Sequence, residues 1–297
     1  MKPTAAVPLD EDRYHSGIPA LTDKEFSLFQ SLVYKESGIF LNVSKKSLIV
    51  GRLAKRLREL GLKRFEDYYH KIQESGPDEV QILLNLISTN ETHFFREPRH
   101  FDLLWQVIFP EWKAAGETAV RPKKIRVWSA ACSTGEEPYS LAMILLDYFP
   151  FASGWEIEIV ATDISTQVLD QARQGIWALE KKKEIPEKYL KAFMLKGSGS
   201  QEGKIKADPE IRSLIHFSWM NLNENNYPIV GSFDMVFCRN VLIYFDQESK
   251  TAVTGRMLDR LSPGGYLFLG HAESLVFGDN KRVKTIIPTV YQYNRLG

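Results

Sequence analysis

The sequence predicts an α/β fold with a mainly parallel sheet, preceded by a separate all-helical unit. Between residues 121 and 297, short apolar runs alternate with helical segments, a pattern typical of a parallel sheet covered by helices on both faces. Between residues 21 and 88, apolar residues recur only at helical spacing. A chain of 297 residues also exceeds what one ordinary core serves, which favours two unequal domains.

Composition and charge are those of a folded globular chain. Of its residues, 44% are hydrophobic and 25% are charged, as in soluble enzymes. No apolar run approaches the roughly 20 residues of a spanning helix, and the N-terminus lacks a signal-peptide layout, so we expect a cytoplasmic protein without membrane insertion. The net charge of +1 does not favour a nucleic-acid partner. Cys132 and Cys238 lack CxxC spacing, which predicts buried thiols and no metal site.

An all-helical domain is expected over residues 21–88, after a flexible segment at 1–20. Thr22 and Glu25 have capping-box spacing in front of apolar residues at helical intervals, and Gly38 suits the end of this first helix. Three more helices are expected at about 45–60, 65–75 and 77–87. In the second of these, we expect the following residues to form the buried face: Leu48, Ile49, Leu53, Leu57 and Leu60.

The remaining chain is divided into a connecting region at 89–120 and a second domain at 121–297. A polar-aromatic stretch at 89–96 precedes a helix through Leu103 and Trp105. Residues 176–212 are too long for an ordinary connection and predict an inserted subdomain. The other elements are expected as strands at 125–128, 157–162, 233–238 and 266–269, helices at 136–149, 165–174 and 247–261, and a closing hairpin at 283–287 and 290–293.

The turn after the first expected strand is the first candidate site. Its small residues let the backbone approach a ligand, and ligands of such folds bind beyond the carboxyl ends of the strands. A dinucleotide fold would have three glycines here, whereas this turn has only Gly135, followed by Glu136 and Glu137. Two carboxylates would repel a pyrophosphate and suit a cationic ligand such as a sulfonium, although acids also favour the first turn of any helix.

Two further strand ends carry polar residues. Asp163 ends the second strand, where nucleoside-binding folds hold ribose hydroxyls; alternatively it caps the next helix, as Ser165 could also do. Asn240 follows the strand at 233–238 and could bind the amino-acid part of a cofactor through its amide. Tyr244 could line the pocket or pack in the core. Together these residues indicate a cofactor that carries a nucleoside.

Five strings, in this order, resemble the chemotaxis receptor glutamate methyltransferases, the CheR family. They are S-T-N-E-T-H-F-F-R-E, W-S-A-A-C-S-T-G-E-E-P-Y-S, A-T-D-I-S, F-C-R-N-V-L-I-Y-F and L-S-P-G-G-Y-L-F-L-G-H-A-E-S. The resemblance runs from about residue 22 to the end. It implies a Rossmann-like methyltransferase domain dependent on S-adenosylmethionine (SAM), with a small inserted β-subdomain at 176–212 and an all-helical N-terminal domain.

The resemblance also implies a reaction and a set of cofactor contacts. The methyl group of SAM would pass to glutamate carboxylates of chemoreceptors, giving methyl esters for chemotactic adaptation and S-adenosylhomocysteine. Asn90, Thr92 and Arg96 would close over the cofactor. Glu137 and Asp163 would bind its polar groups, with Glu136 as the alternative to Glu137. The remaining contacts would be Asn221, Leu222, Arg239 and Asn240.

The implied substrate is the cytoplasmic helical region of chemoreceptors, and some family members also dock a C-terminal receptor peptide on the β-subdomain. A glutamate carboxylate is already anionic at neutral pH, so no strong base is needed; Arg96 and Tyr244 are expected to steer it. Basic residues outnumber acids in the second helix and predict a receptor-docking surface, although charged helix faces are often merely solvated. The docking candidates are Arg52, Lys55, Arg56 and Arg58.

Three other functions are weaker interpretations. A silent SAM-binding adaptor is disfavoured because the matched positions carry the expected residue types. A nucleic-acid methyltransferase would have an Asn/Asp-Pro-Pro-Tyr string, and nucleic-acid binding would place stacking aromatics within the basic surface; neither is present. A nicotinamide-dependent dehydrogenase would need the second and third glycines of its phosphate-binding turn.

Overall fold

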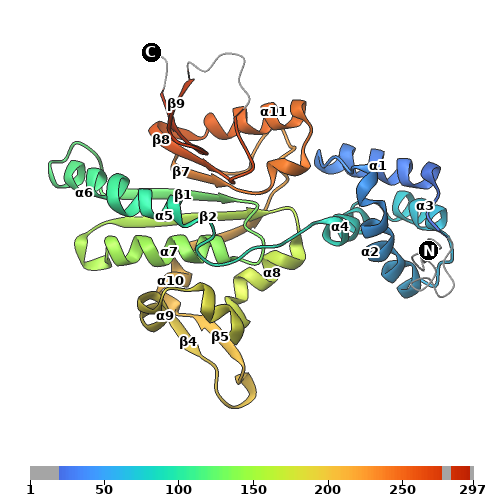
Figure 1. Cartoon of the computed structure of the whole chain (residues 1–297), viewed down its shortest axis with the longest axis horizontal. Helices are drawn as coiled ribbons and strands as arrows, with labels where there is room; N and C mark the ends of the chain where they lie inside the picture. Colours follow the sequence, from blue (N-terminus) through green and yellow to red (C-terminus); the bar gives the residue numbers. More distant parts are fainter. Residues whose placement is uncertain (1–19, 276–281, 295–297) are drawn as a thin grey trace, which may run out of the picture. The chain divides into compact units, whose positions relative to one another are not determined.

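The computed structural model describes residues 20–275 and 282–294, so most of the segment expected to be flexible at 1–20 lies outside the described residues. The chain divides into two compact units (Figure 1). Of the described residues, the first unit contains 20–36 and 40–87, and the second contains 37–39, 88–275 and 282–294.

The first unit is helical, as predicted. Its helices are α1 (Asp23–Ser37), α2 (Lys46–Glu59), α3 (Phe65–Ser75) and α4 (Pro77–Ile87), with a short 3-10 turn, η2 (Val43–Lys45). The predicted capping box is confirmed: the Glu25 amide donates to Thr22 Oγ1 at 3.2 Å, and the Thr22 amide donates to Glu25 Oε2 at 2.9 Å. Ile49, Leu53 and Leu57 are buried as expected, but Leu48, directly before Ile49 in α2, is 43% exposed, because consecutive helix residues point about 100° apart.

The second unit contains a seven-stranded sheet in the order β6-β2-β1-β7-β8-β10-β9. Strands β6, β2, β1, β7 and β8 run parallel, and β10 pairs antiparallel with β8 and β9. The strands are β1 (Lys124–Ala130), β2 (Glu156–Asp163), β6 (Ile215–Trp219), β7 (Phe233–Cys238), β8 (Leu261–Leu269), β9 (Val283–Ile287) and β10 (Val290–Tyr293). The hairpin was predicted with these bounds, whereas β8 begins five residues before the predicted Tyr266.

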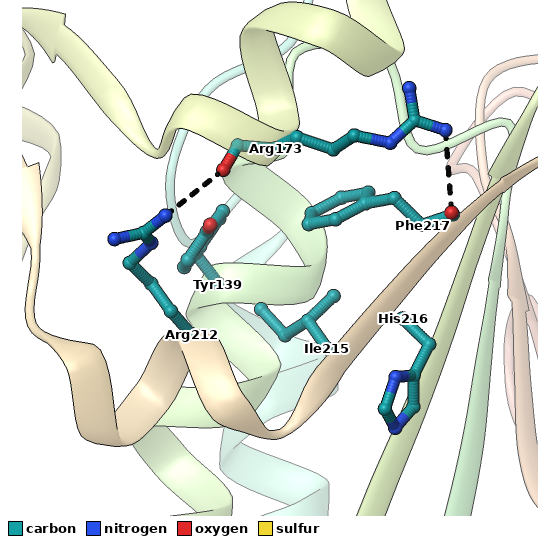
Figure 2. A pocket seen from close by; sticks show the side chains of 6 residues that line it. All are labelled: Tyr139, Arg173, Arg212, Ile215, His216 and Phe217. Carbon is teal, nitrogen blue, oxygen red and sulfur yellow. Dashed lines mark hydrogen bonds between the residues drawn. The ribbon is translucent and has the colours of Figure 1, made fainter.

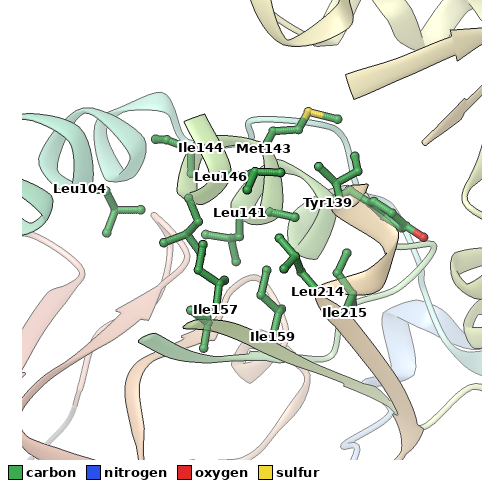
Figure 3. Close-up of a cluster of buried hydrophobic side chains, with 14 of the residues drawn as sticks. Leu104, Tyr139, Leu141, Met143, Ile144, Leu146, Ile157, Ile159, Leu214 and Ile215 are labelled. Carbon is green, nitrogen blue, oxygen red and sulfur yellow. The ribbon is translucent and has the colours of Figure 1, made fainter. Parts of the chain in front are cut away.

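Helices cover both faces of this sheet (Figure 1). They are α5 (Pro98–Leu103), α6 (Phe109–Glu117), α7 (Glu136–Tyr148), α8 (Thr166–Gln174) and α11 (Gln247–Leu258). On one face, Leu141 and Ile144 of α7 pack with Ile157 and Ile159 of β2 (Figure 3). On the other face, α11 packs against alternate residues such as Trp128 and Val236. The helix expected through Trp105 is divided by a π-helical turn, η3 (Leu104–Ile108).

The predicted insertion is a small antiparallel sheet with short helices. Its strands are β3 (Ile176–Ala178), β4 (Met194–Lys196) and β5 (Lys204–Ala207), in the order β3-β5-β4. The other elements are η5 (Leu179–Glu184), α9 (Glu187–Phe193), η6 (Gly199–Gln201) and α10 (Pro209–Ser213). Both cysteines are buried free thiols, as predicted. In the part of the chain that the structure describes, no helix is long and apolar enough to cross a bilayer.

Candidate active site

The candidate site lies at the carboxyl ends of the central parallel strands. From β1 the chain adds β2 and β6 on one side of the sheet, and β7 and β8 on the other. The strand order therefore reverses between β1 and β7, and in open α/β sheets the crevice at such a reversal binds the ligand. The sequence-predicted residues Glu137, Asp163 and Asn240 follow or end strands around this point.

The turn between β1 and α7 has an unusual backbone. Ala131 and Ser133 have φ values of 62° and 51°, and Gly135 has a φ of 97°. Left-handed conformations of this kind are disfavoured for residues with a Cβ and cluster at functional sites. At Gly135 a Cβ would also lie only 3.1 Å from the Cβ of Ala172. The turn thus needs its glycine, and its shape directs backbone amides toward the end of β2.

Asp163 is buried at the end of β2. Its Oδ2 accepts a hydrogen bond from the Ser133 amide at 2.8 Å, and its Oδ1 accepts one from the Ser165 amide at 2.9 Å. Burial raises the pKa of Asp163, while these backbone amides act in the opposite direction. The backbone amide of Ile164 is a third hydrogen-bond donor to this carboxylate. A carboxylate has about four acceptor sites, so the three amides leave acceptor capacity for a ligand hydroxyl. The alternative prediction, that Asp163 caps the next helix, agrees with its contact to the Ser165 amide at the start of α8; ribose binding stays a prediction.

Glu137 and Arg239 form a buried ion pair at the carboxyl ends of β1 and β7. Glu137 Oε2 accepts from Arg239 Nε at 2.6 Å, and Glu137 Oε1 accepts from Ser129 Oγ at 2.6 Å. The neighbouring Glu136 points elsewhere: Thr134 Oγ1 donates to it at 2.6 Å, and Lys181 Nζ lies 3.3 Å away. The two acids, equivalent by spacing, thus have different surroundings, and Glu137 is the one that joins β1 to the end of β7.

Asn240, directly after Arg239, has an unsatisfied acceptor. Its φ is 60°, its amide donates to Glu273 Oε2 at 2.8 Å, and its Nδ2 lies 3.5 Å from Glu97 Oε1. Its Oδ1 is buried and has no hydrogen-bond partner among the described residues. A buried polar atom without a partner costs about 1–3 kcal/mol, which a ligand donor would recover.

The remaining predicted contacts lie near this edge of the sheet. Asn221 and Leu222 follow β6 and are buried; Asn221 Oδ1 accepts from the Asn223 amide at 2.9 Å. The adjacent Met220 amide donates to the backbone oxygen of Asp163 at 3.0 Å. The chain after β6 is therefore fixed beside the end of β2.

Residues 89–96, here called the covering segment, are attached to the site through their backbone. The carbonyl oxygen of Asn90 accepts from Ser133 Oγ at 2.8 Å, that of Thr92 from Lys181 Nζ at 2.9 Å, and that of Arg96 from the buried guanidinium of Arg239. The Arg96 guanidinium donates to the Glu91 carbonyl at 3.1 Å.

Tyr244 lies in a 3-10 turn, η7 (Leu242–Tyr244), just after the end of β7. Its ring is half-buried, and among the described residues it makes no hydrogen bond with Arg96. Their joint role in steering the substrate stays a prediction.

Two acids of the site were not predicted from the sequence. Glu97 has a φ of 60°, lies 3.6 Å from Arg239 Nη1 and 3.4 Å from His100 Nδ1, and accepts from the His271 amide at 3.0 Å. Glu273 accepts from the amides of Asn240 and Gly270 at 2.8 and 2.7 Å. Both acids belong to the strings that carry the family resemblance. Their place in these strings could have identified them as candidate site residues.

The four docking candidates on α2 differ in their surroundings. Arg56 Nε and Nη2 donate to the two oxygens of Glu79 in α4 at 2.9 and 2.7 Å, and Arg52 donates to the Ile87 carbonyl. Lys55 and Arg58 are exposed. Within the helical unit, two of the four guanidinium or ammonium groups therefore tie α2 to α4.

A separate cavity of about 330 Å³ lies beside the edge strand β6 (Figure 2). Its two arginines already have backbone partners: Arg173 donates to the Phe217 carbonyl, and Arg212 donates to the Arg173 carbonyl at the end of α8, both at 3.4 Å. These bonds satisfy an edge-strand and a helix-end carbonyl. The cavity contains none of the predicted site residues.

The donor set at the crevice fits SAM. The two oxygens of Asp163 suit a ribose diol, the unsatisfied Oδ1 of Asn240 suits an ammonium, and the guanidinium of Arg239 suits a carboxylate. The acids at the start of α7, Glu136 and Glu137, are paired with Lys181 and Arg239 of the protein itself. The fold and the site together define a SAM-dependent methyltransferase.

Comparison with known proteins identifies the family. The profile described as "CheR methyltransferase, SAM binding domain" matches residues 90–291, and "CheR methyltransferase, all-alpha domain" matches residues 24–88. The chain belongs to the CheR methyltransferase family.

Curated relatives resemble almost the whole chain. "Chemotaxis protein methyltransferase 2" of Pseudomonas aeruginosa is 40% identical over 91% of this chain and 93% of its own length. "Chemotaxis protein methyltransferase" of Escherichia coli is 40% identical over 86% of each. The protein of that name from Borreliella burgdorferi is 36% identical over 92% of this chain and 95% of its own.

Proposed function

We propose that this enzyme transfers the methyl group of SAM to glutamate side chains in the cytoplasmic helical region of chemoreceptors. The observation that carries the acceptor half of the proposal is the likeness to relatives named chemotaxis protein methyltransferases along nearly the whole chain. The acceptor helices are cytoplasmic, so the same proposal puts the enzyme in the cytoplasm.

In this proposal each residue of the candidate site binds a different part of the cofactor. The carboxylate of Asp163 binds the ribose hydroxyls, and Asn221 and Leu222 border the adenosine. Asn240 Oδ1 and Glu137 receive the ammonium, and Arg239 holds the carboxylate. Asn90, Thr92 and Arg96 cover the bound molecule, because their backbone is bonded to Ser133, Lys181 and Arg239.

The chemistry requires positioning more than proton transfer. Bound SAM supplies an electrophilic methyl group whose C–S bond breaks as a carboxylate oxygen forms the new C–O bond, with the electron pair left on sulfur. The acceptor carboxylate is already ionised at neutral pH, so the protein needs no general base. Arg96 and Tyr244 hold that carboxylate in line with the methyl group, and an in-line arrangement can contribute several kcal/mol.

Two surfaces serve the receptor in this proposal. The first is the basic face of α2, where the exposed Lys55 and Arg58 are the main groups and Arg52 and Arg56 add positive charge nearby. It contacts the acidic substrate helices.

The second surface is the β-subdomain, which accepts a C-terminal receptor peptide. Strand β4 is an edge of its sheet, so a peptide can add as a further strand. A hollow of about 510 Å³ beside β4 is lined by Lys196, Lys204 and Lys206, which suit acidic groups on the peptide.

The test uses SAM with a labelled methyl group and membranes rich in the receptor. We expect labelled receptor whose label is released as methanol by mild base, because a carboxyl methyl ester hydrolyses readily. Label that resists base would indicate N-methylation and contradict the proposal. Arg96→Ala is expected to lower turnover by orders of magnitude; near-normal turnover would remove Arg96 from the site.

A further inference from the structure

The covering segment has little secondary structure of its own, so its backbone polar groups need partners elsewhere. Two of these partners come from the inserted β-subdomain. Lys181 Nζ donates to the Thr92 carbonyl at 2.9 Å, and Glu184 Oε2 accepts from the Phe94 amide at 3.0 Å. An ammonium and a carboxylate from one short turn, η5, thus satisfy a carbonyl and an amide two residues apart in the segment.

Lys181 and Glu184 also hold each other and the start of α7. Lys181 Nζ lies 3.2 Å from Glu184 Oε1 and 3.3 Å from Glu136 Oε1. Glu136 is almost completely buried, and the next residue is Glu137 of the crevice. The same lysine therefore connects the insertion, the covering segment and the helix that begins at the cofactor site.

Aromatic contacts connect the same three parts. Phe94 of the covering segment makes an edge-to-face contact with Trp177 of β3, with ring centroids 5.0 Å apart, and Trp177 in turn contacts Tyr139 of α7 at 5.0 Å. Phe95 stacks on Tyr189 of α9 at 5.2 Å. These ring pairs place the segment between α7 and the insertion, and the two charged side chains fix its register.

We infer that Lys181 and Glu184 are positioning residues for SAM binding: they hold the covering segment in the conformation that closes over the cofactor. The insertion, besides any role in receptor docking, then sets cofactor affinity. The inference rests on the proposed function only in taking residues 89–96 as part of the cofactor site. It needs no receptor, since S-adenosylhomocysteine affinity reports it directly.

The test compares two neighbouring lysines of η5 in the full chain. Lys181→Met removes the ammonium that reaches the segment, and Lys182→Met removes an equal charge from an exposed side chain. A hydrogen bond from a charged donor supports a loss of about tenfold in S-adenosylhomocysteine affinity for Lys181→Met, measured by calorimetry. Lys182→Met is expected to stay within about twofold of the parent. Equal affinities for a folded Lys181→Met and Lys182→Met would overturn the inference.

A second pair of variants decides the matter if Lys181→Met does not fold. Glu184→Ala removes the acceptor for the Phe94 amide, whereas Glu184→Gln keeps a carbonyl oxygen there. We expect Glu184→Ala to speed hydrogen exchange of the peptide containing Phe94 and weaken S-adenosylhomocysteine binding, and Glu184→Gln to restore both partly. A role in general stability alone would lower the melting temperature without this selective exchange, and that outcome would also overturn the inference.

The two proposals fail in different ways. If the enzyme did not methylate the receptor, S-adenosylhomocysteine affinity would still respond to Lys181. If Lys181 had no positioning role, base-labile methylation of the receptor would still be observed.

Discussion

Each of the two units contains an arginine–glutamate pair of similar geometry, and the pairs have different surroundings. In the helical unit Arg56 meets Glu79 at 2.7 Å, with side chains 19% and 7% exposed. In the second unit Arg239 meets Glu137 at 2.6 Å, with side chains 2% and 10% exposed. By distance and burial alone, the two pairs would receive the same interpretation.

The residues around the two ion pairs differ. Glu79 also accepts from the Tyr68 hydroxyl at 3.0 Å, so this pair joins three helices. Beside Arg239 lie the left-handed backbone of Asn240 and its unsatisfied Oδ1. A buried ion pair is therefore weak evidence of function in itself; strained backbone and unmet acceptors at a reversal of strand order are what distinguish a binding site.

The largest effect should come from the acid at the end of β2. Asp163→Ala removes two charged acceptors for the ribose, each worth about 1.5–3 kcal/mol, so we expect more than about 100-fold weaker S-adenosylhomocysteine binding by calorimetry. Asp170→Ala is the matched control, since Asp170 is exposed and its carboxylate pairs with Arg173 of the same helix, α8. A comparable loss of S-adenosylhomocysteine affinity in both variants would contradict the assignment of Asp163 to the cofactor site.

The helical pair should respond in stability and not in cofactor binding. Arg56→Met leaves Glu79 buried without its cation, and breaking such a pair costs about 3 kcal/mol, measured by urea unfolding of the full chain. Arg58→Met, on the exposed face of α2, should change stability by less than about 0.5 kcal/mol. Weakened S-adenosylhomocysteine binding in Arg56→Met would contradict a purely structural role for this pair.

The two units are also expected to differ in how their stability depends on pH. Burial and nearby Arg239 lower the pKa of His100 from 6.5 to about 4. Between these values the unfolded chain binds a proton that the folded chain does not. The second unit should thus keep its full stability above about pH 6.5 and lose up to about 3 kcal/mol on acidification toward pH 4.

The helical unit should lose stability only at lower pH. Arg56 lowers the pKa of Glu79 from its ordinary 4.5, so this contribution is present above about pH 4.5 and is lost as the pH falls through the lowered value. His100→Gln should flatten the stability profile between pH 6.5 and 4, while His70→Gln, at an exposed position, should not. An unchanged profile in His100→Gln would contradict this assignment.

The smallest effect is expected at the proposed docking face. Lys55→Glu with Arg58→Glu should raise the KM for receptor-rich membranes several-fold at low salt, because exposed charges interact weakly and are screened. The kcat and the S-adenosylhomocysteine affinity should not change. If receptor binding by the parent enzyme were insensitive to salt up to about 0.5 M, electrostatic docking would be wrong.

Much of this architecture was predictable because local patterns determine it. The capping box at Thr22, the alternation of strands and helices, and the polar residues at strand ends all depend on neighbours in sequence. The contacts that complete the site do not. Lys181 reaches Thr92 from 89 positions away, and Arg239 reaches Glu137 from 102.

Other features could not be predicted because they depend on tertiary packing. The choice between Glu136 and Glu137 could not be made from spacing, because each acid is assigned by the partner that folding brings to it, Lys181 or Arg239. Leu48 was expected on the buried face of α2 but is exposed, whereas the next residues, Ile49 and Val50, are buried.

The most direct test of the distinction between the two pairs is to neutralise one acid in each. Glu137→Gln and Glu79→Gln are the same chemical change at similarly buried positions, and each removes the carboxylate that lies nearest to the arginine of its pair. S-adenosylhomocysteine affinity of the full chain, measured by calorimetry, should fall at least about tenfold in Glu137→Gln and stay within about twofold of the parent in Glu79→Gln. Equal affinities in the two variants would contradict the assignment of the Glu137–Arg239 pair to the cofactor site.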